Sequence, residues 1–162
     1  MFYSLCFTPI LGEQASAPLS TKTAMPAHHT LKRRVLFHET DMAGVMHFSN
    51  YFRLMEEVEH DFFRSLDLSV MMTHEALEIG WPRVAASCEY LGPLRFEDEV
   101  EMVMRVTKVG EKSFNYEVEF LWEGRRVALG KMTSVCCEML EAGMRSIPIP
   151  PGIRAKLENG KQ

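Results

Sequence analysis

The sequence lacks the features of several large classes of protein. It has no basic excess, because 22 aspartates and glutamates outnumber 18 lysines and arginines and the formal net charge is -4. Nucleic-acid-binding domains usually carry a basic excess or a basic stripe. We therefore expect no nucleic-acid partner. No apolar run approaches the roughly 20 residues that a membrane-spanning helix needs, so we also expect no membrane span.

Cysteine is scarce, and nothing in the sequence indicates a metal or redox cofactor. The four cysteines form no CxxC pair, and the six histidines match no zinc-binding spacing. The sequence also has no phosphate-binding loop, no dinucleotide fingerprint and no GxSxG elbow. Isolated cysteines of this kind are typical of a reducing compartment, so we expect a cytoplasmic protein without a cofactor.

The length of 162 residues fits one domain, with 46% hydrophobic and 25% charged residues. Residues 1–30 show no regular pattern, and we interpret them as a disordered leader or as a misassigned start, because Met25 precedes the first patterned segment. No lysine or arginine precedes the apolar stretch from Met1 to Leu11, which argues against a signal peptide. Residues 31–150 are then the folded domain, and residues 151–162 a C-terminal tail along the surface.

One long helix is predicted in the first half of the chain. Between Tyr51 and Leu66, apolar residues recur at helical spacing and form a wide stripe. Such a stripe is typical of a helix that other structure surrounds. Ser49 or Asn50 can cap its start. We interpret Glu59 and Asp61 as surface charges.

Strands are predicted on both sides of this helix. Alternating apolar residues predict a first strand over residues 31–37, before a loop over residues 38–48. The same alternation recurs in four later segments, residues 84–90, 100–106, 114–120 and 127–137. Short turns between them predict an antiparallel meander with one solvent-exposed face. Residues 69–79 could form a short second helix that ends at Trp81-Pro82. The fold class is therefore α+β.

The loop before the long helix carries a family motif. Residues 38–51 contain Asp41, Gly44, Val45, Asn50 and Tyr51 in a pattern that resembles the 4-hydroxybenzoyl-CoA thioesterase branch of the hotdog superfamily. Glu56, residues 89–99 and a proline-bearing tail support the resemblance, which covers roughly residues 31–150. It implies the hotdog fold, an antiparallel sheet wrapped around one long central helix. It also implies self-association to a dimer or tetramer through sheet edges, and hydrolysis of an acyl-CoA thioester to free acid and CoA.

The resemblance assigns Asp41 as the catalytic carboxylate. An aspartate is ordinarily ionised at neutral pH, so it can attack a thioester carbonyl or deprotonate a water without further activation. From the residue alone, a role in the loop turn is equally compatible. Gly44 would let the loop place the carboxylate beside the helix start. The unpaired N–H of Phe48 or Ser49 there would form the oxyanion hole.

Three further residues are secondary candidates: His47, Tyr51 and Glu56. Many acyl-CoA relatives carry a tyrosine-histidine pair where this chain has His47-Phe48. Because of this difference, the resemblance does not identify the acyl group of the substrate. Glu56 is a candidate because another hotdog branch uses a helix carboxylate, although it could equally be a solvated residue. The alternatives are a 4-hydroxybenzoyl-CoA or 1,4-dihydroxy-2-naphthoyl-CoA thioesterase, and a non-catalytic acyl-CoA or acyl-carrier binding module. Asp41 and Gly44 favour an enzyme, with CoA present only as part of the substrate.

Overall fold

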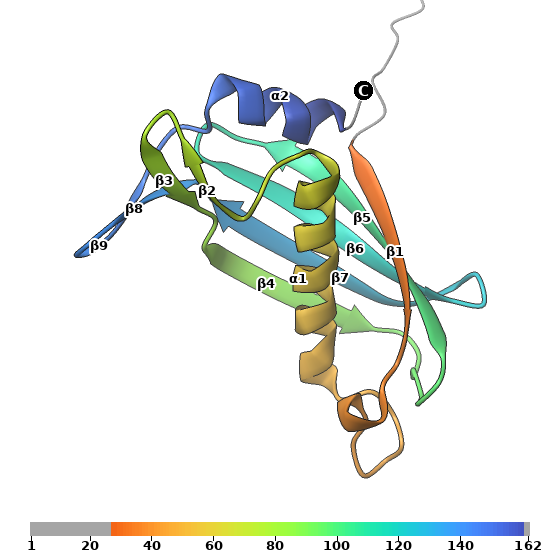
Figure 1. Cartoon of the computed structure of the whole chain (residues 1–162). Coiled ribbons are helices and arrows are strands. Elements are labelled where there is room, and N and C mark those ends of the chain that lie inside the picture. The colour runs from red at the N-terminus through yellow and green to blue at the C-terminus, as the bar shows by residue number, and fades with distance from the viewer. Residues whose placement is uncertain (1–26, 161–162) are drawn as a thin grey trace, which may run out of the picture.

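A long helix, α1 (Phe48–Ser65), lies across one face of a five-stranded antiparallel sheet in the computed structural model, which describes residues 27–160 (Figure 1). The leader expected over residues 1–30 falls almost entirely outside the described residues. In spatial order, the sheet consists of β1 (His28–Arg34), β5 (Glu99–Val109), β6 (Ser113–Trp122), β7 (Arg125–Val135) and β4 (Arg83–Tyr90). A single 3-10 turn, η1 (Phe37–Glu39), follows β1.

The predicted helix is confirmed, but its cap differs from the expectation. The N-cap is His47, whose side chain accepts a hydrogen bond from the Ser49 N–H, so Ser49 and Asn50 lie inside the first turn. Large apolar side chains along α1 are buried against the sheet: Tyr51, Leu54, Met55, Val58, Phe62 and Phe63. This broad buried face agrees with the width of the apolar stripe.

The predicted four-stranded meander is partly wrong. β5, β6 and β7 do form a meander, but β4 pairs with β7 instead of β5, with Ala86 opposite Met132. Residues 91–98 carry the chain across the end of the sheet to β5, which pairs with β1 on its other side. Crossing three strand spacings takes about 14 Å, and an extended chain covers about 3.3 Å per residue, so this link is long enough.

A second, four-stranded sheet replaces the helix expected over residues 69–79. It consists of β2 (Met71–His74), β3 (Leu77–Gly80), β8 (Cys137–Leu140) and β9 (Gly143–Ser146), in that order. Glu75 and Ala76 connect β2 to β3 with φ values of 47° and 66°. Two successive residues with positive φ make the tight turn that joins antiparallel strands, and this turn excludes a helix here.

The segment expected as a surface tail contains helix α2 (Pro151–Asn159). Pro151 occupies the first helical turn, where its missing N–H costs no hydrogen bond. Ile153 and Leu157, one turn apart, are buried and pack the helix against β5. Lys156 donates a hydrogen bond from Nζ to the Leu66 carbonyl at 2.7 Å, which joins α2 to the end of α1. Neither α1 nor α2, the α-helices of the described part, is long and apolar enough to cross a membrane.

Candidate active site

The Asp41 loop is a tight turn stabilised by its own backbone. Asp41 N–H donates to the Val45 carbonyl at 2.9 Å, and Gly44 N–H donates to the Asp41 carbonyl at 2.9 Å. Gly44 has a φ of 71°, a conformation that glycine adopts without strain. One carboxylate oxygen of Asp41, Oδ1, accepts the Ala43 N–H at 2.8 Å, and the side chain is exposed. The turn therefore exposes the Asp41 side chain to solvent, in the loop that precedes α1.

The start of α1 offers one free backbone donor. Ser49 N–H donates to His47 Nδ1 at 3.4 Å, and Ser49 Oγ lies 2.8 Å from the same nitrogen. By contrast, no acceptor among residues 27–160 binds the N–H of Phe48, the first helical residue. Of the two expected oxyanion donors, Phe48 is thus the one whose N–H can point at a ligand.

Glu39 joins the Asp41 loop to α1, a role that the sequence analysis missed. Its backbone carbonyl accepts the His47 N–H at 2.9 Å and Asn50 Nδ2 at 2.7 Å. Its carboxylate accepts Arg33 NH2 and the Leu36 N–H, each at 2.7 Å. Because Glu39 is far from Asn50 in sequence and lies in a polar stretch, no local pattern indicated that it would be buried.

Asp41 and the helix start line one cavity with a volume of about 460 Å³. The lining residues come from the loop, from α1, from the end of β4 and from the segment after it: Asp41, Val45, Met46, Phe48, Tyr51, Tyr90, Leu91, Gly92 and Pro93. The structure thus brings together three of the expected site residues, Asp41, Phe48 and Tyr51. It adds Tyr90, which was expected in a strand and in the segment that supports the family resemblance, but not in the site. Gly44, His47 and Ser49 shape the loop and the cap but do not line the cavity.

Glu56 belongs to a different cluster. Its carboxylate lies 3.1 Å from Arg83 NH1 and 3.7 Å from His60 Nε2, and it does not line the Asp41 cavity. The same arginine pairs with Glu59, which is 0% exposed and also accepts a hydrogen bond from Ser134 Oγ at 3.0 Å. The interpretation of Glu59 as a surface charge was therefore wrong. Its arginine partner lies 24 positions away, beyond the reach of helical periodicity.

Burial keeps the neighbouring phenol and thiol groups protonated. Burial, with smaller effects from Cys88 and Tyr90, raises the pKa of Tyr51 to about 12. Burial also raises the pKa of the Cys88 thiol to about 11. Asp41 is the carboxylate that the described lining residues present to this cavity. Among residues 27–160, no group of three or more His, Cys, Asp or Glu side chains could hold a metal ion.

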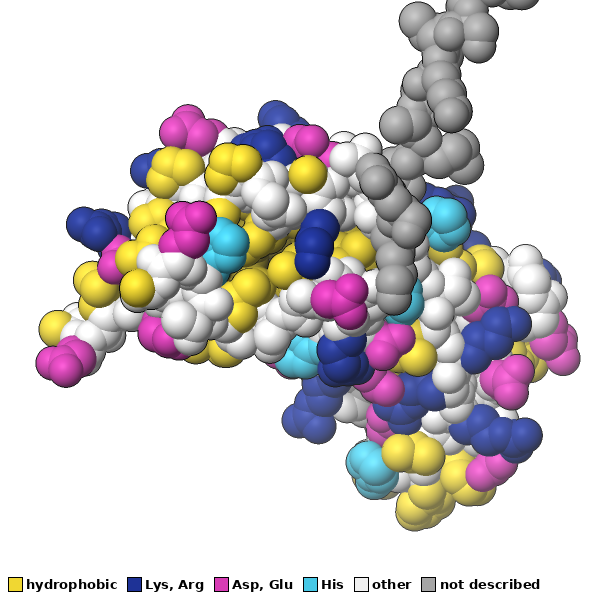
Figure 2. All heavy atoms as spheres, turned by 45° about the horizontal axis from the view of Figure 1, so that its top comes forward, with side chains coloured by type: hydrophobic (Ala, Val, Ile, Leu, Met, Phe, Trp, Pro, Cys, Tyr) yellow, Lys and Arg dark blue, Asp and Glu magenta, His cyan; other side chains and the backbone are white. Residues whose placement is uncertain are grey.

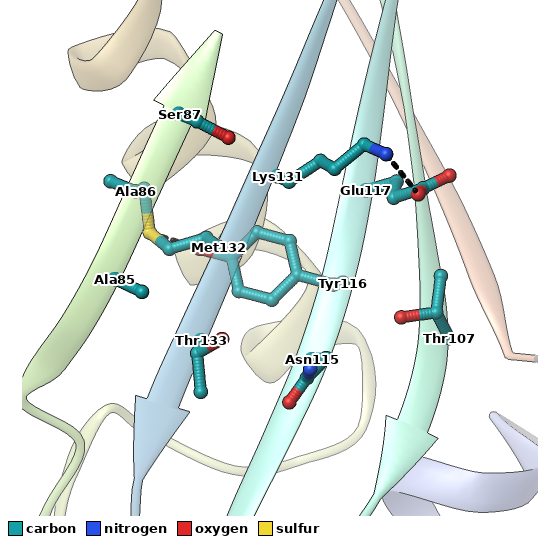
Figure 3. Close-up of a pocket in the computed structure, with 10 residues that line it drawn as sticks. All are labelled: Ala85, Ala86, Ser87, Thr107, Asn115, Tyr116, Glu117, Lys131, Met132 and Thr133. Carbon is teal, nitrogen blue, oxygen red and sulfur yellow. Dashed lines mark hydrogen bonds and ion pairs between the residues drawn. The ribbon is translucent and has the colours of Figure 1, made fainter.

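A second hollow, of about 250 Å³, lies on the outer face of the sheet, opposite α1 (Figure 3). Short side chains such as Ser87, Thr107 and Thr133 surround it. Its carboxylate, Glu117, pairs with Lys131 at 3.4 Å, as the dashed line in Figure 3 marks. The carboxylate of this hollow is already paired with a lysine, and no helix N-terminus is among the lining residues. The hollow is therefore less suited than the Asp41 cavity to attack on a carbonyl group.

Comparison with known proteins identifies the family of this chain. The family model of the thioesterase-like superfamily matches residues 35–157. The chain belongs to this superfamily. The predicted hotdog fold is confirmed, and so is the predicted enzyme class, a thioesterase, at the level of the family. The match extends through most of α2, so this thioesterase-like domain includes the segment that was expected to be a tail.

Individual relatives carry more specific names. A putative esterase of Aquifex aeolicus is 32% identical over 118 residues, which cover 72% of this chain and 89% of the relative. A 1,4-dihydroxy-2-naphthoyl-CoA hydrolase of Prochlorococcus marinus (strain NATL2A) is 31% identical over 104 residues, 60% of this chain and 67% of the relative. The solved structure of a gentisyl-coenzyme A thioesterase superposes with a TM-score of 0.69 at 31% identity and covers 78% of this chain and 99% of its own.

Proposed function

We propose that this protein hydrolyses an acyl-CoA thioester to a free acid and CoA. Asp41 acts as nucleophile or general base, and the Phe48 N–H stabilises the oxyanion. The observation that carries the proposal is that the Asp41 carboxylate and the unpaired end of α1 line the same cavity. A carboxylate beside an unpaired helix N-terminus supplies an attacking group and a donor for the developing negative charge.

The reaction needs few other groups. Either Asp41 attacks the thioester carbonyl carbon, or it takes a proton from a water that attacks instead. In both cases the carbonyl oxygen becomes an oxyanion, and the positive end of α1 favours this charge. When the C–S bond breaks, the CoA thiolate leaves with the electron pair and takes up a proton from solvent. If Asp41 is the nucleophile, water then hydrolyses the acyl-aspartate anhydride and regenerates the carboxylate.

The second candidate function is hydrolysis of CoA esters with an aromatic acyl group. The cavity lining favours an aromatic acyl group over a simple alkyl group. Phe48, Tyr51 and Tyr90 place three aromatic rings on the cavity walls. Rings of this kind pack well against a planar aryl group. The names of the naphthoyl-CoA hydrolase and gentisyl-CoA thioesterase relatives point to the same class of substrate. The alternative of a non-catalytic binding module has less support, because a binder has no need of an exposed carboxylate beside a free N–H.

Steady-state hydrolysis of aryl-CoA and alkyl-CoA esters, followed by thiol release, tests the proposal. We expect Asp41→Asn to lower kcat by on the order of 10²- to 10⁴-fold and to leave KM nearly unchanged, because the amide keeps the shape and loses the charge. Asp67→Asn is the matched control, since Asp67 is an exposed aspartate at the other end of α1. Glu56→Gln is measured in parallel. A near-wild-type kcat in Asp41→Asn would contradict the assignment, and a large loss in Glu56→Gln would move it to the helix carboxylate.

A further inference from the structure

We propose that Tyr90 is a positioning residue for this reaction, and that its ring selects aromatic over alkyl acyl groups. The hydroxyl group would hold the first turn of α1 in the orientation that the oxyanion requires. The inference rests on the proposed function, because it concerns the same cavity and the same Phe48 N–H.

A hydrogen bond joins the end of β4 to the start of α1. Tyr90, the last residue of β4, donates its hydroxyl to the Phe48 carbonyl at 3.2 Å. In a regular α-helix this carbonyl also accepts the N–H of residue 52, and its two lone pairs allow both bonds. The hydroxyl therefore restrains the backbone of Phe48, whose own N–H is the free donor. A rotation of the first turn would break this bond, so Tyr90 resists such a movement.

The ring of Tyr90 forms one wall of the cavity. It makes an edge-to-face contact with Tyr51, with ring centroids 5.0 Å apart, and Tyr51 makes a similar contact with Phe120 at 5.1 Å. Tyr51 is buried, whereas Tyr90 is 46% exposed and lines the cavity. Contacts on one side thus fix the orientation of the Tyr90 ring, and its remaining surface is available to a ligand. A planar aryl group gains more from such a wall than a flexible alkyl chain does.

The hydroxyl remains a donor over the working pH range. Burial, with smaller effects from Cys88, raises the pKa of Tyr90 above its ordinary value. The phenol therefore keeps its proton at neutral and mildly alkaline pH. A phenolate could not donate to the Phe48 carbonyl.

Two substitutions separate the hydroxyl from the ring. Tyr90→Phe removes only the hydrogen bond, and we expect kcat to fall about 3- to 10-fold, the effect of one hydrogen bond, with KM within twofold of wild type. The loss should be equal for aryl-CoA and alkyl-CoA substrates. Tyr90→Leu removes the ring as well, and we expect the same loss of kcat together with a rise in KM for aryl-CoA alone. A merely structural role would not produce this split between kcat and KM.

Amide hydrogen exchange provides a readout that does not depend on turnover. In Tyr90→Phe, the amide of Phe52 should exchange faster, because its acceptor carbonyl is less restrained, while the amides of the β5–β6–β7 meander keep their protection. Unchanged exchange at Phe52, or a wild-type kcat in folded Tyr90→Phe, would overturn the positioning role. An unchanged aryl-to-alkyl ratio of kcat/KM in Tyr90→Leu would overturn the selective role of the ring.

Asp41→Asn in the same assays distinguishes the two proposals. If Asp41→Asn is inactive while Tyr90→Phe behaves as wild type, the proposed reaction stands and the positioning role is wrong. If Asp41→Asn retains full activity while Tyr90→Phe is slowed with unchanged KM, the positioning of the helix start stands and Asp41 is not the catalytic group.

Discussion

Met55 on α1 packs directly over Gly130 on β7. A Cβ atom at residue 130 would lie 2.6 Å from Met55 Cε, closer than real Cβ atoms are found, and 3.2 Å from Met55 Cγ, tighter than most real Cβ contacts. Met55 is fully buried and cannot move into solvent. The missing side chain of Gly130 therefore lets α1 approach the sheet closely at a point two turns beyond the N-terminus of the helix.

We expect Gly130→Ala to lower the free energy of unfolding by about 1–3 kcal/mol, the usual cost of overpacking a core. Gly152→Ala is the control, because a Cβ there meets no atom within 4 Å and alanine favours the helical conformation of α2. It should be neutral or slightly stabilising. Urea denaturation of both variants measures the difference, and equal stabilities would show that Met55 can move away without cost.

Proline substitution tests the oxyanion donor. Phe48→Pro removes the N–H of the first helical residue, where proline is tolerated, and His47 before it already has the extended ψ of 136° that a following proline requires. We expect kcat to fall on the order of 10²- to 10³-fold, while Phe48→Ala keeps most of its kcat. Circular dichroism must first show that each variant is folded.

Ser49→Pro is a less clean comparison. It removes an N–H that His47 already binds, and it pushes helical Phe48 toward an extended conformation, so we expect it to lower stability. Wild-type turnover by both folded proline variants would rule out the helix N-terminus, and a side-chain donor such as His47 would then be the better candidate.

The high pKa of Tyr51 predicts how stability changes in alkaline solution. A folded-state pKa of about 12 exceeds the ordinary tyrosine value of 10.0, so the stability from the neutral phenol is fully present below pH 10 and is lost as pH rises toward 12. The difference in unfolding free energy between wild type and Tyr51→Phe should therefore be constant from pH 7 to 9. Above pH 10, the wild type should become less stable relative to the variant. Denaturation curves at a series of pH values measure it. Parallel curves up to pH 11.5 would contradict the raised pKa.

The two edge strands of the five-stranded sheet differ in charge, and this difference predicts how the protein self-associates. The edge strand β1 carries Lys32, Arg33 and Arg34, whereas the β4 edge has an uncharged run from Val84 to Cys88 that includes exposed Ala85, Ala86 and Ser87. Charged edges resist pairing and uncharged edges permit it. We therefore expect a dimer, or a larger even oligomer, that pairs through β4.

A charge placed on each edge in turn tests this arrangement. Ala86→Asp should shift the mass measured by light scattering toward the monomer, whereas Thr30→Asp on β1 should not. A wild-type protein that is monomeric and fully active at micromolar concentration would rule out the expected assembly. Loss of association in Thr30→Asp alone would place the interface at β1.

Self-association and the cytoplasmic location remain predictions. The uncharged β4 edge supports pairing between copies, while the spacing of the cysteines is the basis for the location. The mechanism of attack, by Asp41 directly or through water, is likewise a prediction, and trapping of an acyl-enzyme would separate the two.

Elements with strong local signals could be predicted from the sequence. The apolar stripe of α1 and the alternation in β4 to β7 each repeat over enough residues to identify the element. The Asp41-Gly44 motif identified the loop, because the turn depends on residues close together in the chain. These features are local, and a single sequence therefore contains the information needed to predict them.

Contacts between elements that are distant in sequence became known from the folded structure alone. The pairing of β4 with β7, the pairing of β3 with β8 and the burial of Glu59 depend on partners far along the chain. The same is true of Tyr90, which reaches the Phe48 carbonyl from 42 positions away. Chain crossings, buried ion pairs and cavity walls form when elements pack, and periodicity within one element says nothing about its neighbour. The Asp41 turn was therefore predictable from sequence, whereas the Tyr90 wall of its cavity was not.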